Sequence, residues 1–117
     1  MLSPDNRLRH RADFSDVVRR GRRASRPLLT LHLLGNPTPG VDRPVRAGLV
    51  VSKAVGGSVV RSRVSRRLRH QLRTLLPAVP AGSRLVVRAA PAAATATSDH
   101  HGADLRAALA KLTRIPQ

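Results

Sequence analysis

The stretch VVSKAVGGSVVRSRVSRRLRHQLR, residues 50–73, decides the fold. In its second half, apolar side chains recur every four residues, at Val60, Val64, Leu68 and Leu72. This spacing places them on one face of an amphipathic helix, which we predict over residues 59–76. Ser58 is a suitable N-cap for this helix, and Pro77 marks its end.

The same helix carries charge of one sign only. Its six arginines lie at positions 61, 63, 66, 67, 69 and 73, and no acid stands three or four residues away to pair with them. A run of charges is ordinarily a solvated helix face. Here the like charges repel one another along the helix, which favours a surface that binds a polyanion.

The turn before this helix, AVGGS over 54–58, has two readings. It lacks the Gly-Lys-Ser/Thr ending of a nucleotide-binding P-loop, so we reject that motif. Gly56, Gly57 and the helix N-terminus can still cradle a backbone phosphate, with Lys53 and Arg61 beside it. The alternative is an ordinary turn from strand to helix.

Shorter elements flank this region. Strands are predicted over residues 28–34, 45–52 and 84–88, from apolar or alternating runs between turn residues. The first two are expected to pair as a hairpin across the loop at 35–44.

Two further helices are predicted. Phe14, Val17 and Val18 share one face of a short helix over 12–20, with Gly21 as its stop. A final amphipathic helix is predicted over 104–114, and Ser98 or Asp99 could cap an earlier start.

The remaining segments have loop composition. Residues 1–10 are expected to form a loose basic arm, and the alanine-rich residues 89–98 an irregular linker before the last helix. The whole chain, 1–117, is expected to form one domain. Its order of elements indicates a small α+β fold with helices packed on a mostly antiparallel sheet.

Composition points to the kind of partner. Lys and Arg number 22 and Asp and Glu number 6, for a formal net charge of +16. The positive charges of so basic a compact protein repel one another unless a polyanion neutralises them. Nucleic acid is therefore the leading candidate partner, and an anionic membrane surface is the second. There is no cysteine, which excludes disulfides and thiolate metal sites. With no apolar run of membrane-spanning length and no secretory signal, we expect a cytoplasmic protein.

The search for catalytic residues finds none. The five histidines have no metal-ligand spacing, there is no glutamate, and the six aspartates are scattered. The sequence therefore offers no candidate site for paired-carboxylate or two-metal catalysis. Asp13 and Asp16 are better explained by the dipole of a helix N-terminus than by catalysis.

The segment that contains the arginine-rich helix resembles the signature of a known protein family. GLVVSKAVGGSVVRSRVSRRLRHQLR resembles the signature of the bacterial ribonuclease P protein subunit, in a Val-Ser-Lys strand end, a Gly turn and a basic helix. The matching residues are Gly48, Ser52, Lys53, Gly56, Val59, Arg61, Arg63, Arg66 and Arg69. LRHRADFSDVVRRGRRASRP, near the N-terminus, is similar to the family's first helix and following strand, so the resemblance covers nearly the whole chain.

The resemblance implies a fold. It is a two-layer αβββαβα sandwich, of the ribosomal protein S5 domain 2-like kind, with a mixed sheet packed by helices. It adds a short strand near residues 23–25 and a left-handed parallel βαβ crossover around the arginine-rich helix, against the usual right-handed rule.

The resemblance also implies a function. The family removes the 5′ leader of precursor tRNA as part of the ribonuclease P holoenzyme, in which the RNA subunit with Mg²⁺ is the catalyst. No protein catalytic residue and no protein metal site are expected. The partners would be ribonuclease P RNA and precursor tRNA, with no membrane and no small-molecule substrate.

Two RNA-facing surfaces follow from the match. The docking surface for the RNA subunit would be Lys53, Gly56, Gly57, Arg61, Ser62, Arg63, Arg66 and Arg69. The leader would bind in a cleft formed by Arg11, Phe14, Val18, His32 and Val50.

The chain departs from the family pattern at three places. Ser62 stands where an Asn is usual, and Ser65 replaces a common basic residue. The cleft has lost aromatic side chains, so leader binding should rely on arginine and apolar contact. Which of Leu31 and His32 faces the cleft is open, since one residue of register reverses a strand's faces. The alternative function is a non-enzymatic ribosome-associated or general RNA- or DNA-binding protein.

Overall fold

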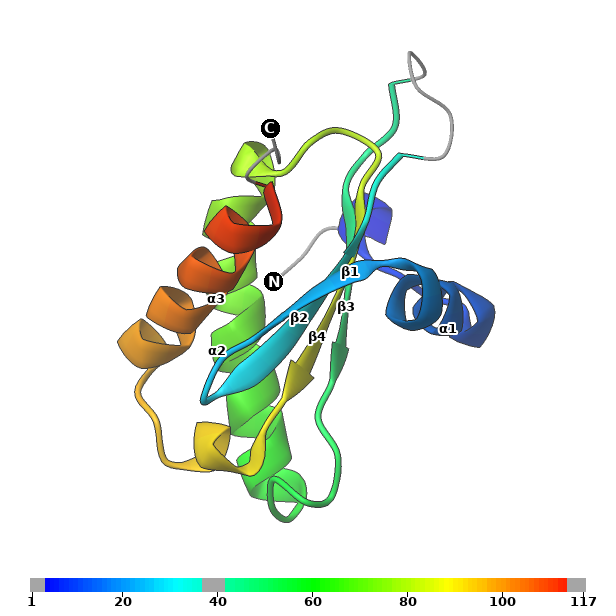
Figure 1. Ribbon diagram of the computed structural model, residues 1–117. Coiled ribbons are helices and arrows are strands. Elements are labelled where there is room, and N and C mark those ends of the chain that lie inside the picture. The colour runs from blue at the N-terminus through cyan, green and yellow to red at the C-terminus, as the bar shows by residue number, and fades with distance from the viewer. Residues whose placement is uncertain (1–3, 37–41, 114–117) are drawn as a thin grey trace.

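A computed structural model describes residues 4–36 and 42–113 of the chain. Within them the element order is αβββαβα, as the resemblance implies (Figure 1). The helices are α1 (Arg11–Arg20), α2 (Ser58–Leu75) and α3 (Ser98–Thr113). The strands are β1 (Arg22–Ser25), β2 (Leu29–Leu34), β3 (Arg46–Val50) and β4 (Arg84–Ala89).

The four strands form one mixed sheet in the order β1-β2-β4-β3. β1 pairs antiparallel with β2, and β2 pairs antiparallel with β4. β3 runs parallel to β4, so α2 is the crossover between two parallel neighbours. The hand of this crossover stays a prediction of the resemblance.

The predicted hairpin of β2 and β3 is wrong, because β4 lies between the two strands. β4 has the run RLVVRA, in which Leu85, Val86 and Val87 are each at most 1% exposed. A strand that is apolar on both faces is stabilised at the centre of a sheet, where helices cover both sides. The loop between β2 and β3 is too long to impose a tight-turn pairing.

The two faces of the sheet have separate cores. α2 and α3 lie together on one face and α1 lies on the other (Figure 1). Leu31, Leu85 and Val87 pack with α2 and α3, through Val64, Leu68 and Leu72 of the predicted apolar stripe. The smaller cluster under α1 joins Leu8, Val17 and Val86. Because side chains alternate along a strand, each face has its own chemistry.

The N-terminal segment differs from the expected loose arm. Residues 4–6 form a short 3₁₀ helix, and Arg7 bridges to Ala47 at the outer edge of β3. The Leu8 amide donates to the Ala47 carbonyl over 3.0 Å, and the Leu8 side chain is buried. Pairing satisfies an edge that β3 would otherwise present to solvent, which is the physical reason that this segment is held.

The alanine-rich segment is likewise ordered. Residues 91–94 form a 3₁₀ helix, and Ala93 is fully buried in the main core. The α3 helix begins at Ser98, so an earlier start than residue 104 is confirmed, but neither Ser98 nor Asp99 is its cap. Its cap is Thr97, whose hydroxyl accepts from the His100 amide over 3.2 Å. Small side chains let the segment pass close to α2, so composition alone was a poor guide to disorder.

Candidate nucleic-acid interface

The N-terminus of α2 is open to an anion. The N-cap is Gly57, one residue before the predicted Ser58, and no side chain caps the helix. The first turn contains no acid. The amides of a first helical turn lack partners within the helix and carry the positive end of the helix dipole. A phosphate oxygen is therefore a fitting acceptor here.

Gly56 is required by a close approach. A Cβ at this position would come within 2.9 Å of the Val60 side chain, so the turn fits against α2 only as glycine. Arg61 folds back over the same turn, and its Nε donates to the Gly56 carbonyl over 3.1 Å. This bond explains how a charged side chain sits next to the apolar stripe.

Ser58 and Ser62 each line both of two surface hollows beside the start of α2. One, of about 320 Å³, is lined by Val51, Ser58, Arg61, Ser62, Ser65 and Arg69. The other, of about 340 Å³, is lined by Ser58, Val59, Ser62, Arg63 and Arg66. Each hollow thus has two arginines. The structure brings Arg61, Ser62, Arg63, Arg66 and Arg69 of the predicted docking surface together, with Lys53 exposed in the preceding turn.

Two arginines of α2 also have a structural role. Nη2 of Arg63 donates to the Ala94 carbonyl over 3.1 Å, and Nη1 of Arg67 donates to the Ala96 carbonyl over 2.9 Å. Arg66 and Arg69 are exposed and make no ion pair within the described residues. The helix therefore holds the alanine-rich segment with one flank and leaves the other arginines available.

The residues predicted to bind the leader lie on the α1 side of the sheet. Phe14, Val18 and Val50 pack around the cluster of Leu8, Val17 and Val86. The Phe14 ring lies against Gly48 so closely that a Cβ on Gly48 would not fit. Arg11 is exposed at the start of α1. Phe14 is thus a base-sized apolar surface whose inner face is fixed by the sheet.

His32, not Leu31, faces this side. Leu31 belongs to the core under α2 and α3, and alternation turns His32 the other way. His32 lies in the cross-strand row Arg23–His32–Val86–Gly48 beneath α1. It is 3% exposed, and neither ring nitrogen has a hydrogen-bond partner within the described residues. Burial, with the nearby charges of Arg88 and Arg23, lowers the pKa of His32 below its usual value.

Sequence reasoning missed Arg23 and Arg88. Arg88 is exposed and pairs across the sheet with Thr30 and Val50, on the same face as His32. The signal was present in RLVVR, because a period of two puts Arg84, Val86 and Arg88 on one face. The guanidinium groups of Arg23 and Arg88 place positive charge near His32, on the α1 side of the sheet.

An ion network attaches α1 to β4. Arg84 donates to Asp16 over 2.9 Å and to Asp13 over 3.4 Å, and Arg20 donates to Asp16 over 3.0 Å. The hydrogen bond from Arg20, followed by that from Arg84, lowers the pKa of Asp16, although partial burial opposes this. Both carboxylates of α1 therefore pair with arginines. The helix dipole, which the sequence offered as their explanation, does not predict these ion pairs, and only Asp13 lies in the first turn of α1.

The described part of the chain offers no group of three or more His, Cys, Asp or Glu side chains suited to a metal ion. Nor does it contain a helix long and apolar enough to span a bilayer. The arrangement holds two arginine-bearing surfaces rigid against an α+β scaffold. Such a scaffold defines a class: a small basic protein that binds a phosphate-rich polymer.

Comparison with known proteins identifies the family. The family model described as Ribonuclease P matches residues 2–113. A ribonuclease P protein component from Streptomyces avermitilis is 54% identical and spans 96% of this chain and 95% of its own. One from Thermobifida fusca is 52% identical, over 97% of this chain and 80% of its own. The chain belongs to the ribonuclease P protein family.

Solved structures agree on the fold. The ribonuclease P protein of Staphylococcus aureus superposes with a TM-score of 0.79 at 23% identity, over 93% of this chain and 98% of the other. That of Thermotoga maritima gives 0.74 at 24% identity, over 95% and 98%. Because the chain belongs to the ribonuclease P protein family, it is a subunit of the ribonuclease P holoenzyme, an endoribonuclease of tRNA processing, and its partner is RNA.

Proposed function

We propose that the protein binds the catalytic RNA subunit of ribonuclease P through α2 and its preceding turn, and the 5′ leader of precursor tRNA through the α1 side of the sheet. The observation that carries the proposal is the pair of two-arginine hollows beside Ser62, next to an uncapped helix N-terminus. The alternative of a general nucleic-acid-binding protein has no support from the comparisons.

The docking surface suits two runs of RNA backbone. Arg61 and Arg69 serve one hollow, and Arg63 and Arg66 serve the other. Guanidinium groups bind phosphate in a bidentate way, and each neutralised phosphate releases condensed counterions. Ser62 lines both hollows and is exposed, so its hydroxyl can donate to a phosphate in either one.

The leader surface combines one stacking group with charge. Phe14 offers a ring face to a base, and Val18 and Val50 extend the apolar contact. Arg23 and Arg88 on the same face of the sheet attract the sugar-phosphate backbone. His32 is buried beneath this surface, and its ring N–H can donate to the bound RNA if binding supplies an acceptor.

Mg²⁺ belongs to the RNA in this proposal. Asp13 and Asp16 are bonded to arginines, so neither is available as an open carboxylate site. The protein's contribution is positioning and charge screening where RNA strands converge, which lowers the Mg²⁺ needed for folding and binding of the RNA. A cytoplasmic location is part of the proposal.

Filter binding to ribonuclease P RNA across a salt series tests the docking surface. The variant Arg66→Gln/Arg69→Gln should weaken binding and reduce the salt slope by about one unit per lost phosphate contact. Its matched control is Arg106→Gln/Lys111→Gln, which removes the same charge from exposed positions on α3. Equal affinities and slopes for the two variants would refute docking by α2.

A further inference from the structure

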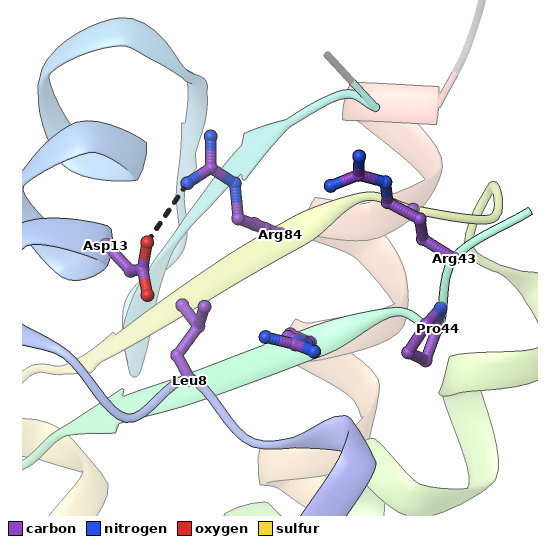
Figure 2. Close-up of a pocket in the computed structure, with 7 residues that line it drawn as sticks. Leu8, Asp13, Arg43, Pro44 and Arg84 are labelled. Carbon is purple, nitrogen blue, oxygen red and sulfur yellow. Dashed lines mark hydrogen bonds and ion pairs between the residues drawn. The ribbon is translucent and has the colours of Figure 1, made fainter. Parts of the chain in front are cut away.

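A third basic feature lies at the edge of the sheet, apart from both surfaces above. It is a hollow of about 240 Å³, which we call the edge hollow. Figure 2 shows its side chains converging from the N-terminal segment, α1, the segment before β3, and β4. The lining residues are Leu8, Asp13, Arg43, Pro44, Arg46, Gly82 and Arg84.

The edge hollow carries a net positive charge that is not neutralised. Arg84 is held by Asp13 and Asp16, as the dashed line to Asp13 in Figure 2 illustrates. Asp13 is the one acid of the lining, so its charge is already used. Arg43 and Arg46 are exposed and have no ion pair or side-chain hydrogen bond within the described residues. Two guanidinium groups thus face one hollow without an acceptor.

Two residues of the lining, Leu8 and Pro44, give the edge hollow an apolar part. Leu8 is 7% exposed, and its amide donates to the Ala47 carbonyl of β3. Pro44 restricts the backbone just before β3. Gly82 has a φ of +77°, a conformation that side-chain-bearing residues rarely adopt, and it sets the turn into β4. Figure 2 shows Leu8 and Pro44 on the side of the hollow away from the Arg84 guanidinium.

These features match one nucleotide unit of an RNA strand. The two guanidinium groups can bind a phosphodiester, and the ribose or the edge of a base can pack against Leu8 and Pro44. The volume lies below the roughly 300–1,000 Å³ of pockets that enclose small organic ligands, which favours a contact with part of a polymer.

The edge hollow is a separate contact and not an extension of the docking surface. Arg46 is the first residue of β3. Val50 is the last, at the end of the strand that leads to α2. Four residues of strand span about 13 Å, so one phosphate cannot reach both ends. Of the residues that line the edge hollow, none belongs to the predicted leader cleft of Arg11, Phe14, Val18, His32 and Val50.

We propose that Arg43 and Arg46 bind a phosphodiester of RNA in the edge hollow, as a third contact of the holoenzyme with RNA. The inference rests on the proposed function, since it assumes an RNA partner. It adds a site that neither the arginine-rich helix nor the α1 surface contains.

The test compares Arg43→Gln/Arg46→Gln with the α3 control Arg106→Gln/Lys111→Gln at equal net charge. Binding is measured for ribonuclease P RNA, precursor tRNA with a leader, and mature tRNA, each across a salt series. For at least one RNA, the variant should lose about tenfold in affinity at low salt, and its salt slope should fall by about one to two units. Arg43→Lys/Arg46→Lys should keep the slope, because it keeps the charge.

The RNA that responds identifies the source of the phosphate. If all three RNAs bind Arg43→Gln/Arg46→Gln as they bind the α3 control, the proposal is wrong. It is equally wrong if the variant loses only the thermal stabilisation given by inorganic phosphate, since that marks a site for a free anion. The Arg66→Gln/Arg69→Gln variant runs alongside. If only Arg66→Gln/Arg69→Gln loses RNA affinity, docking by α2 stands and the edge-hollow proposal is wrong. If only Arg43→Gln/Arg46→Gln loses it, the edge-hollow proposal stands and docking by α2 is wrong.

Discussion

Arg63 and Ala94 are joined by a hydrogen bond of 3.1 Å, from Nη2 of the arginine to the carbonyl oxygen of the alanine. A residue of the proposed docking surface therefore also fastens the segment that leads into α3. The neighbouring bond from Arg67 to the Ala96 carbonyl does the same one turn later. Arg63 and Arg67 thus have a structural role, and Arg63 also lines one of the hollows of the proposed docking surface.

Arg63→Ala should therefore affect stability as well as RNA binding. Loss of a charge-assisted bond to a half-buried carbonyl should cost about 1–2 kcal/mol, a Tm decrease of about 5 °C or more. Arg66→Ala, which loses no such bond, should leave Tm nearly unchanged while weakening RNA binding. Thermal unfolding of both variants measures this, and equal Tm values would show that the bond contributes nothing.

Phe14→Ala should weaken binding of precursor tRNA that has a leader and spare mature tRNA. Stacking of one base on an aromatic ring contributes about 1–3 kcal/mol, so we expect a loss of about tenfold or more in affinity. Phe14→Leu is the control, because it keeps apolar contact under α1 but removes the ring face. Equal losses on precursor and mature tRNA would refute a leader-binding role for Phe14.

His32 should make stability depend on pH on the acid side of neutrality. Its folded-state pKa lies below the ordinary 6.5, so the unfolded chain takes up the proton first. Its stabilising contribution is complete above pH 6.5 and is lost as pH falls toward the folded-state pKa. The slope is at most about 1.4 kcal/mol per pH unit.

Urea unfolding at several pH values measures this effect. His32→Leu should flatten the dependence below pH 6.5, whereas His70→Leu, at an exposed position of α2, should not. A His32→Leu protein with the same pH profile as the wild type contradicts the assignment of the buried imidazole.

Asp16→Asn should loosen α1. The carboxylate accepts from Arg20 and Arg84, and these bonds keep its pKa below 3.8. Its contribution is present above that pH and is lost as pH falls through the lowered folded-state pKa. The variant should be less stable at pH 7, should converge with the wild type in strong acid, and should show faster amide exchange in α1. Unchanged exchange in α1 argues against the network as the attachment of this helix.

Sequence patterns identified the three helices and the strands β2, β3 and β4, whereas β1 was expected only from the family resemblance. The four-residue recurrence of Val60, Val64, Leu68 and Leu72 is the core stripe of α2, and the residues of RLVVR form most of β4. Strand pairing was the failure, since adjacency along the chain favoured β2 with β3. What decided the pairing was burial on both faces of β4, a property of the assembled sheet.

The candidate site was predicted unevenly for a similar reason. Arg61 through Arg69 are brought together because they share one helix, which periodicity reveals. Arg43 and Arg46 gather with Leu8 only through the pairing of the N-terminal segment with β3. Residues 4–10 and 89–98 have loop composition. Their order depends on the bonds from the Leu8 amide to the Ala47 carbonyl and from Arg63 to the Ala94 carbonyl, which local sequence does not predict.

The most direct test of the central claim is reconstitution. Purified protein is mixed with a bacterial ribonuclease P RNA and precursor tRNA at an Mg²⁺ concentration too low for the RNA alone. The account predicts removal of the 5′ leader only when protein and RNA are both present. Cleavage by the protein without RNA, or no cleavage by the mixture, would contradict it.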